Sequence, residues 1–510
     1  MLARLISRIT IADGSRERIP VVAPFTGATL AAIPACTGCD VEAAVATARA
    51  AQPEWAALPV VHRARIFLRF HDLLLQRQDE VLDLIQLENG KARRHAFEEV
   101  LDTAIVARYY ARHAGRLLRP RRRKGALPLL TKTYEYRVPV GVVGLIVPWN
   151  YPLNLAITDA IPALIAGNTA VLKPDPQTSL TALWAVDLLR EAGLPDGVLR
   201  VITGDGALLG PALCEHAGYI MFTGSTRVGR LVARQAADRL VGCSLELGGK
   251  NPMLVLADAD LQAAVDGAIR GCFVGAGQVC ISMERIYVDQ SIYAEFVARF
   301  VTRAKNLKLG AQMDYSAEMG SLTSAAQLAR VEDHVADALK RGAVLESGGL
   351  RRPDLGPLFY EPTILTGVRE NMKLYGEETF GPVVSVYPFA TEREAVELAN
   401  QTPYGLNASV WTRNTRRGVA LAARIQAGSV NVNEAYAAAW GSVDSPSGGM
   451  KQSGLHPRHG AEGILKFTES QTIAVQRIIP IAPSHGVSAQ TYARVMTRLL
   501  SLLRYIRVIG

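Results

Sequence analysis

Cysteine is scarce in this sequence, and long apolar runs are missing. Six cysteines among 510 residues are too few for the disulfide framework of a small secreted domain. No window of 18 uncharged apolar residues occurs, so we expect no membrane-spanning helix. Arg4 and Arg8 interrupt the first segment, which therefore does not have the apolar core of a signal peptide. These features favour a protein of the reducing cytoplasm.

Acidic residues are absent from the two segments that carry the excess positive charge. The formal net charge is +9, and it is concentrated in the basic run 116–124 and in the segment 480–510. The rest of the chain is close to neutral, which argues against a nucleic-acid-binding surface. The simplest interpretation of 116–124 is a solvated turn between domains. Cys36 and Cys39 form a C-x-x-C pair without a second pair, so we expect no metal site.

Strands and helices alternate from about residue 134 onward. Apolar strands are expected at 141–147, 169–174 and 219–224, each followed by a helical segment. This alternation predicts parallel βαβ units in a doubly wound sheet, with a nucleotide at the carboxyl ends of the strands. A second series of the same kind begins after Glu246. With 49% hydrophobic residues in a chain of this length, the sequence supports two or three domains.

Helices and two isolated strands surround these series. Residues 40–58 have helical spacing behind Asp40 as the expected N-cap, and a second helix is expected from about 62 to 87. The strand-like segments 131–139 and 466–477 have no local partner. We expect them to pair with each other, leaving a free edge that could join another subunit.

The most informative local motif is Gly277-Gln278-Val279-Cys280. A cysteine nucleophile needs an exposed turn with nearby backbone N–H donors, and an upstream glycine allows that turn. Taken alone the motif is weak, because a buried structural cysteine such as Cys272 is the commoner case.

Two further motifs offer partners for such a nucleophile. Glu246 ends a strand one residue ahead of the pair Gly248-Gly249, where it could act as a general base, the alternative being a strand-end salt bridge. Asn150, in the segment Pro148-Trp149-Asn150, could offer a side-chain N–H to a developing oxyanion.

Two of the three remaining motifs suit a nucleotide or another anionic group. Lys173-Pro174 closes a strand and suits a ribose or phosphate contact. Residues 222–229 run through Gly224 and Ser225 into a helix N-terminus, which suits an anionic group although the pattern is not G-x-G-x-x-G. The last motif is Glu-Glu-Thr-Phe-Gly-Pro at 377–382.

Together and in this order, the six motifs resemble those of the NAD(P)-dependent aldehyde dehydrogenase superfamily, from about residue 20 to 478. The resemblance implies that Cys280 is the nucleophile, Glu246 the base, and Asn150 with the backbone N–H of Cys280 the oxyanion hole. The implied reaction passes through a thiohemiacetal and a thioester before hydrolysis to the acid. The residues implied for NAD(P) are Lys173 and Glu378 at ribose, Phe380 near the nicotinamide, Gly224 and Ser225 at the phosphates, and Trp149 and Leu247 through their backbones.

The resemblance also implies an α/β fold of the aldehyde dehydrogenase type, with two doubly wound parallel-sheet domains and a small β oligomerisation element. A homodimer or homotetramer is the corresponding expectation. The expected parts are a cofactor-binding domain at 1–120 and 140–246, a catalytic domain at 247–447, oligomerisation strands at 121–139 and 464–480, and a basic amphipathic tail at 481–510.

Pro176 departs from the pattern of NAD-preferring members, which have Glu three residues after the lysine. Losing that carboxylate removes a hydroxyl acceptor and a charge that repels a 2′-phosphate. We therefore expect NADP to be preferred and NAD to be accepted, with Asp175 as the one nearby acid.

Several segments resemble the second actinobacterial type of NADP-dependent succinate-semialdehyde dehydrogenase, among them GPLFYEPTIL and KQSGLHPRHGAEG. Better-known enzymes for that substrate place arginines where this sequence has Thr158 and Val274. Either other basic residues bind the distal carboxylate, or the substrate is a medium-chain or other apolar aldehyde.

The tail carries an apolar stripe at helical spacing, flanked by four arginines. This pattern suits a helix on an anionic membrane surface, and the alternative is a helix that packs on its own or a neighbouring subunit. The stripe consists of Val495, Leu499, Leu502, Ile506 and Ile509.

A cofactor-independent cysteine hydrolase would share the nucleophile Cys280 but would need a histidine partner. None of the nine histidines lies in the six motifs. A non-catalytic relative would have no reason to retain Cys280, Glu246 and Asn150 together.

Overall fold

The computed structural model describes residues 1–126, 130–477, 480–483 and 486–504. The chain divides into two compact units, which are described separately. The larger unit comprises Met1–Leu117 and Pro139–Phe467, and the smaller unit comprises Leu118–Val138 and Thr468–Gly510.

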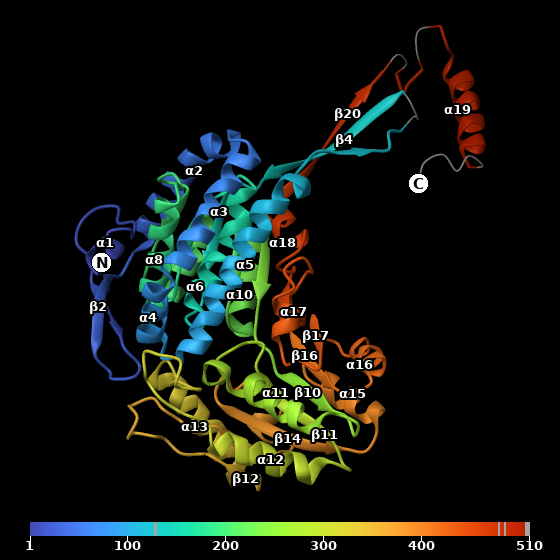
Figure 1. The fold of residues 1–510 in the computed structure, drawn as a ribbon. Coiled ribbons are helices and arrows are strands. Elements are labelled where there is room, and N and C mark those ends of the chain that lie inside the picture. Colours follow the sequence, from blue (N-terminus) through green and yellow to red (C-terminus); the bar gives the residue numbers. More distant parts are fainter. Residues whose placement is uncertain (127–129, 478–479, 484–485, 505–510) are drawn as a thin grey trace. The chain divides into compact units, whose positions relative to one another are not determined.

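A six-stranded sheet forms the first core of the larger unit (Figure 1). Its order is β19-β9-β8-β5-β6-β7, and every neighbouring pair is parallel except β19 with β9. Strands β5, β6 and β8 are buried along their whole length, as expected for strands covered by helices on both faces. The strands are β5 (Val142–Ile146), β6 (Thr169–Lys173), β7 (Leu199–Val201), β8 (Tyr219–Thr223), β9 (Gly242–Glu246) and β19 (Gly454–Leu455).

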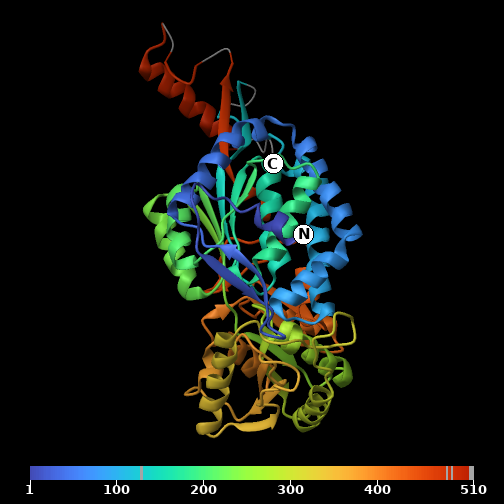
Figure 2. The same ribbon diagram turned by 90° about the vertical axis from the view of Figure 1, so that its left-hand side faces the viewer.

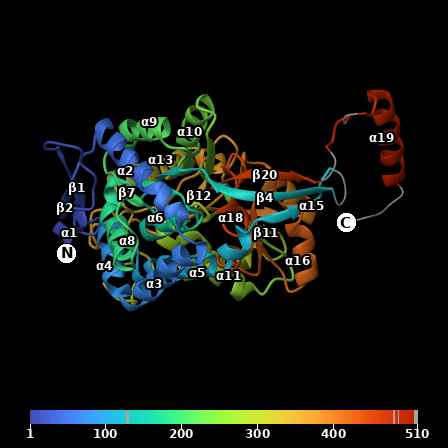
Figure 3. The same ribbon diagram turned by 90° about the horizontal axis from the view of Figure 1, so that it is seen from above.

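Helices cover both faces of this sheet, so the predicted doubly wound arrangement is confirmed. One face is covered by α2 (Gly38–Ala57), α9 (Gly206–His216) and α10 (Thr226–Asp238). The other is covered by α7 (Ala160–Ile165), backed by α6 (Pro152–Ile157), α8 (Ser179–Glu191) and the long α5 (Arg93–Leu117). Figure 3 shows α9 and α10 on one side, with α3, α4 and α5 on the other.

Two of the predicted helices differ at their ends. Asp40 is not the N-cap of α2: the cap is Thr37, and Asp40 is the third helical residue, accepting the backbone N–H of Thr37 at 2.8 Å. The single helix expected at 62–87 is two helices, α3 (Val60–Gln76) and α4 (Gln78–Asn89). The helix breaks because Arg77 takes φ −111° and ψ 21°, outside the helical region.

A seven-stranded sheet forms the second core, in the order β12-β13-β14-β11-β10-β16-β17. Only β12 is antiparallel to its neighbour, so the second parallel series is also confirmed. Figure 2 shows this sheet with its helices as a lobe of its own, below the first sheet. Its elements are β10 (Asn251–Val255), α11 (Leu261–Phe273), β11 (Met283–Asp289), α12 (Tyr293–Lys305), α13 (Ala325–Lys340), β12 (Val344–Ser347), β13 (Thr363–Thr366), β14 (Val383–Phe389), β16 (Asn407–Trp411) and β17 (Ser429–Val432).

After the second sheet the chain returns to the first, because β19 pairs with β9 through Gly454 and Glu246. The remaining elements of the larger unit are short or peripheral. They are α1 (Leu2–Ile6), β1 (Arg18–Val22), β2 (Thr29–Pro34), α14 (Lys373–Gly376), α15 (Glu392–Asn400), β15 (Tyr404–Gly405), α16 (Thr415–Ala422), α17 (Ala437–Trp440), β18 (Met450–Lys451) and α18 (Glu462–Leu465).

The smaller unit contains a three-stranded sheet of order β20-β4-β3, formed by β3 (Arg121–Arg123), β4 (Thr131–Pro139) and β20 (Thr468–Gln476). The predicted pairing of the two isolated strands is thus confirmed. The basic run is not simply a solvated turn, because three of its arginines form β3 and pair with β4.

The tail forms α19 (Ala489–Leu503), which begins at Ser488, whose hydroxyl accepts the backbone N–H of Thr491 at 3.2 Å. The predicted stripe positions Ile506 and Ile509 lie outside the described residues. Within the described ranges, no helix is both long enough and apolar enough to cross a bilayer.

Candidate active site

The predicted motifs meet at one edge of the six-stranded sheet. Strands β5, β6, β8 and β9 are parallel neighbours, so their carboxyl ends lie along the same edge. The residues that close or follow these strands are Trp149 and Asn150 after β5, Lys173 at the end of β6, Gly224 and Ser225 after β8, and Glu246 at the end of β9.

A cavity of about 460 Å³ opens at this edge, and we call it the polar cavity. It also receives residues from the second sheet's side of the molecule, so that both series contribute to one site. Lys173 and Pro176 are not among its lining residues. The predicted residues that line it are Trp149, Asn150, Gly224, Ser225, Glu246, Leu247, Cys280, Glu378 and Phe380.

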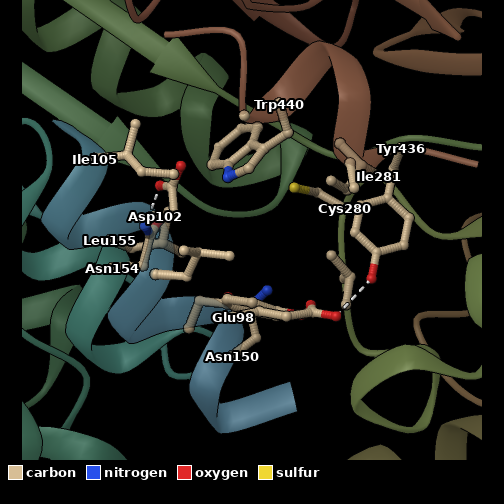
Figure 4. A pocket seen from close by; sticks show the side chains of 15 residues that line it. Glu98, Asp102, Ile105, Asn150, Asn154, Leu155, Cys280, Ile281, Tyr436 and Trp440 are labelled. Atoms are coloured by element: carbon tan, nitrogen blue, oxygen red, sulfur yellow. Dashed lines mark hydrogen bonds between the residues drawn. The ribbon is translucent and has the colours of Figure 1, made fainter. Parts of the chain in front are cut away.

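A second cavity, of about 260 Å³, has aromatic and aliphatic walls, and we call it the aromatic cavity (Figure 4). Asn150 and Cys280 line both cavities, so they stand where the two meet. The other residues lining the aromatic cavity are Glu98, Leu101, Asp102, Ile105, Tyr151, Asn154, Leu155, Val279, Ile281, Tyr436, Ala437, Trp440 and Gly441.

The backbone before Cys280 makes a left-handed turn. Gly275, Ala276 and Gly277 have φ values of 55°, 55° and 71°. At Gly277 a Cβ atom would lie 2.0 Å from the carbonyl oxygen of Gly381, so only glycine fits there. The turn expected from the upstream glycine is therefore present, and Cys280 follows it directly.

The segment after Glu246 packs against the backbone of Cys280. The side-chain amide of Asn251 donates a hydrogen bond of 2.8 Å to the carbonyl of Cys280. A Cβ atom at Gly249 would lie 2.6 Å from the same carbonyl oxygen, which explains the glycine at this position. Two motifs that are separate in the sequence thus hold each other in place.

Burial controls the protonation of Cys280 and Glu246. Desolvation raises the pKa of the Cys280 thiol to about 12, and the nearby carboxylates of Glu246 and Glu378 act in the same direction. Desolvation also raises the pKa of Glu246 to about 7, opposed by the charges of Arg458 and Lys466. The Oε1 atom of Glu246 has no hydrogen-bond partner within the described chain. At neutral pH this carboxyl group can therefore accept or release a proton.

Asn150 is held in place through both its side chain and its backbone. Its amide donates to the carbonyl of Gln278 at 3.0 Å, and its backbone carbonyl accepts from Lys91 at 2.6 Å. Lys91 also forms a buried ion pair with Glu99 at 2.6 Å, and Glu99 accepts the backbone N–H of Leu153 at 2.9 Å. One N–H of the Asn150 amide remains for a substrate oxygen.

The Glu377–Pro382 motif is fixed by the buried carboxylate of Glu284. This group accepts the backbone N–H groups of Thr379 and Phe380 at 2.9 Å. Phe380 has φ +59°, and its ring meets that of Trp149 edge-on at 5.5 Å between centroids. The Glu378 carboxylate accepts the backbone N–H of Gly249 at 2.8 Å, and burial raises its pKa to about 7.

Lys173 and Pro176 lie at the carboxyl end of β6. Lys173 is 4% exposed, and its ammonium has no hydrogen-bond or ion-pair partner in the part of the chain that is described. A Cβ atom at Gly206, the first residue of α9, would lie 3.3 Å from the Lys173 Nζ. Pro176 begins a 3-10 turn, and the Asp175 carboxylate accepts the backbone N–H of Gln177 at 3.0 Å.

Neither Thr158 nor Val274 belongs to a carboxylate-binding site. The Thr158 hydroxyl donates to the carbonyl of Asn154 at 2.8 Å. Val274 lines a neighbouring cavity of about 310 Å³, together with Arg94, Arg270 and Arg303. These arginines are already paired, Arg94 and Arg303 with Glu318 and Arg270 with Glu434.

Sequence reasoning missed the walls of the aromatic cavity. Glu98, Leu101, Asp102 and Ile105 lie on one face of α5, and no role was expected for that helix. The sequence signal that could have indicated this wall is a pair of acids four residues apart, Glu98 and Asp102, on an otherwise apolar helical face. The buried cluster near Glu246, in which Asp159 pairs with Arg458 and Lys466, was missed as well.

Comparisons with known proteins agree with this geometry. The family model described as "Aldehyde dehydrogenase family" matches residues 11–473. A protein of Mycolicibacterium smegmatis named "Putative succinate-semialdehyde dehydrogenase", NADP(+) type, is 50% identical over 98% of this chain and 96% of its own length. An NADP-dependent enzyme of E. coli has a TM-score of 0.87 at 34% identity, over 92% of this chain and 97% of its own. The NAD+ complex of an aldehyde dehydrogenase from Bacillus cereus has a TM-score of 0.86 at 36% identity, over 92% of this chain and 96% of its own.

Proposed function

The chain belongs to the aldehyde dehydrogenase family and oxidises an aldehyde to a carboxylic acid, and we propose that it does so through a covalent thioester on Cys280. The observation that carries the proposal is the position of Cys280 and Asn150 at the junction of the two cavities. The aromatic cavity then holds the aldehyde, and the polar cavity holds the cofactor and Glu246.

Cys280 and Asn150 act in the first step. Glu246 accepts the thiol proton, and the Cys280 sulfur attacks the carbonyl carbon to give a thiohemiacetal oxyanion. The Asn150 amide and the backbone N–H of Cys280 donate hydrogen bonds to this oxygen. One such donor contributes about 3 kcal/mol to lowering the barrier.

The polar cavity fits a nicotinamide dinucleotide. At Gly248 a Cβ atom would lie 2.5 Å from a Glu378 carboxylate oxygen, so glycine allows this carboxylate to lie against the backbone at the cavity wall. Ser225 is the N-cap of the 13-residue helix α10, whose N-terminus suits a phosphate. NAD(P)+ supplies the hydride acceptor when bound. The residues that would hold it are Trp149, Lys173, Gly224, Ser225, Leu247, Glu378 and Phe380.

Glu246 acts again in the second step. It first releases the proton taken from the thiol to solvent. As a carboxylate it then takes a proton from water, and the resulting hydroxide attacks the thioester carbon. The proton now on Glu246 goes to the departing sulfur. The carbon–sulfur bond breaks, the acid leaves, and the thiol of Cys280 is restored.

We propose NADP as the preferred cofactor and NAD as a weaker one. The family resemblance implies that Pro176 replaces a glutamate of NAD-preferring members, so no carboxylate at this position repels a 2′-phosphate. The Lys173 ammonium has no partner among the described residues, and the Asp175 carboxylate accepts the backbone N–H of Gln177. The NADP(+) in the names of relatives supports the same assignment.

The cofactor-binding domain in this proposal is 1–120 with 140–246, and the catalytic domain is 247–447. One candidate substrate is an aldehyde without a distal carboxylate, because the described residues lining the aromatic cavity include no lysine or arginine. Succinate semialdehyde is the second candidate, favoured by the names of relatives.

The proposal is tested by initial rates with succinate semialdehyde and a medium-chain aliphatic aldehyde, each with NADP and with NAD. Higher kcat/KM for the aliphatic aldehyde with NADP is expected. Replacing Cys280 with Ala should abolish both activities, and retained turnover in this variant would overturn the covalent mechanism.

We further propose a homodimer or homotetramer joined through the smaller unit, with 121–139 and 464–480 as its oligomerisation strands. Strand β20 is the edge of its sheet, and its side chains Ile473 and Val475 are exposed. Replacing both with Asp should lower the mass measured by light scattering, and an unchanged mass would contradict the proposal.

For the tail at 481–510, we propose peripheral contact with an anionic membrane. Helix α19 exposes Val495, Leu500 and Leu502, and its segment carries arginines without any acid. Co-sedimentation with anionic vesicles should be lost on deleting 490–510. Equal sedimentation of the truncated chain would contradict the proposal.

A further inference from the structure

We propose that Arg227, in the first turn of α10, binds the diphosphate of the nicotinamide cofactor at the wall of the polar cavity. This contact rests on the proposed function, because it adds a residue to the cofactor site described there. It strengthens the binding of NADP and NAD alike, whereas the position of Pro176 concerns only the 2′-phosphate of NADP.

Arg227 stands at an unfavourable place for a cation. Ser225 is the N-cap of α10, so Arg227 is the second helical residue, and the N-terminal end of a helix carries a partial positive charge. Arg230 follows three residues later, and like charges at this spacing repel each other. The first turn of α10 contains no acid that would compensate. An anion bound beside Arg227 would remove this cost.

The Arg227 guanidinium is free to bind such an anion. The side chain is exposed, and within the described chain it has neither a hydrogen-bond partner nor an ion-pair partner. Arg230 and Arg234 of the same helix are also exposed. Of these three arginines, Arg227 alone lines the polar cavity. The cavity therefore distinguishes Arg227 from the solvated arginines of its own helix.

The first turn of α10 is fixed against the cavity. A Cβ atom at Gly229 would lie 2.4 Å from a methyl group of Leu247, so glycine lets the helix pack directly on this residue of the cavity wall. The Thr226 hydroxyl donates a hydrogen bond of 3.3 Å to the carbonyl of Gln452. Arg227 thus extends from a backbone that is held in place, while its own side chain is unengaged.

A second arginine lines the same cavity from the other sheet's side. Arg330 belongs to α13, and its guanidinium donates a hydrogen bond to the backbone carbonyl of Glu378. The acids of the lining set, Glu246 and Glu378, form no ion pair with either arginine in the part of the chain that the structure describes. Two cations without carboxylate partners suit a dianion such as a diphosphate. A guanidinium can bind its oxygens through two parallel N–H···O bonds.

The strand order separates this contact from the 2′-phosphate. Arg227 follows β8, whereas Lys173 and Pro176 lie at the end of β6, and β5 runs between these two strands. Neighbouring strands are about 4.8 Å apart, so the ends of β8 and β6 are about 10 Å apart. Neither Lys173 nor Pro176 lines the polar cavity. Arg227 is therefore assigned to the diphosphate beside Ser225 and not to the 2′-phosphate.

Equilibrium binding of NADPH and NADH to the full chain, without aldehyde, tests this contact. The fluorescence of the reduced nicotinamide reports the Kd. Arg227→Gln should raise the Kd for both cofactors about tenfold, the usual effect of losing one charge-assisted contact. The ratio of the two Kd values should stay unchanged. Arg227→Lys keeps the charge but loses the paired N–H donors, so its Kd values should lie between those of the wild type and Arg227→Gln.

The matched control is Arg230→Gln, which removes the same charge from the same helix at a residue outside the cavity lining. Its Kd values should equal those of the wild type. Adenosine 2′-phosphate has no diphosphate, so it should bind the wild type and Arg227→Gln with the same Kd, measured by competition with NADPH. Without cofactor, the Tm of Arg227→Gln should equal or exceed that of the wild type, because the helix N-terminus loses an unfavourable charge.

Four results would overturn the proposal. The Kd values of Arg227→Gln could be unchanged, or its loss of affinity could be confined to NADPH, which would place Arg227 at the 2′-phosphate. An equal loss in Arg230→Gln would indicate a general effect of charge, and a lower Tm without cofactor would assign Arg227 a structural role. Each of these leaves the proposed function standing. If the wild-type chain binds neither NADPH nor NADH, the proposed function fails as well.

Discussion

The buried ammonium of Lys91 donates a hydrogen bond of 2.6 Å to the backbone carbonyl of Asn150. The side chain of Lys91 is 1% exposed, and Glu99 supplies its counter-charge. The position of the proposed oxyanion-binding amide therefore depends on an ion pair that lies outside both cavities.

Replacing Lys91 with Met should destabilise the fold. The change leaves Glu99 buried without its cation, which typically costs about 3–5 kcal/mol. Urea unfolding followed by fluorescence measures the loss. The control is Arg393→Ala, which removes an exposed ion pair with Glu397 and should cost less than about 1 kcal/mol. Equal losses in the two variants would contradict the role assigned to the buried pair.

Removing the Asn150 amide should lower kcat rather than raise KM. Asn150→Asp keeps the shape of the side chain but has no N–H to donate, and Asn150→Ala removes the group entirely. Both should reduce kcat about 100-fold to 1,000-fold, the usual effect of losing an oxyanion donor. Steady-state kinetics on the two variants checks this. A near-normal kcat in Asn150→Asp would show that the amide does not stabilise the oxyanion.

The activity should fall as the pH drops below about 7. The pKa of Glu246 is raised to about 7 by burial, so its base form prevails only above that value. A plot of kcat/KM against pH should therefore rise through this region and flatten above it. A profile that stays flat from about pH 5.5 to 8 would mean that Glu246 is not the base.

Replacing Pro176 with Glu should shift the cofactor preference toward NAD. The new carboxylate would accept ribose hydroxyls and repel a 2′-phosphate. The ratio of kcat/KM for NADP to that for NAD should fall about tenfold, which corresponds to 1.4 kcal/mol. If the ratio does not move, Pro176 does not lie near the adenosine ribose.

The sequence was sufficient wherever a motif ends a strand. Glu246 and Lys173 end their strands and Gly224 follows one, and the edge at which parallel strands end is set by the fold class alone. The turn before Cys280 was also predicted, from the upstream Gly277. The structure agrees, because a larger residue at this position would meet Gly381.

The sequence was not sufficient where contacts join distant segments. Asp102 and Trp440 line the same cavity although more than 300 residues separate them along the chain, and no local pattern records that proximity. Helix ends were misjudged for a related reason. Thr37 rather than Asp40 caps α2. The side chain of each residue accepts the backbone N–H of the other, which is a capping box, and backbone geometry decides which of the two is the first residue outside the helix.

The covalent mechanism is tested most directly by a single-turnover measurement on Glu246→Gln with NADP and an aldehyde. This variant keeps Cys280 and Asn150 but has no base to activate water. Because the substituted amide is also a poor acceptor for the thiol proton, the reaction is started above about pH 9, where more of the thiol is ionised. The account predicts a burst of about one reduced cofactor per active site, slow turnover afterwards, and an acyl adduct on Cys280 detectable by mass spectrometry. Steady turnover at the wild-type rate, with no adduct on Cys280, would contradict it.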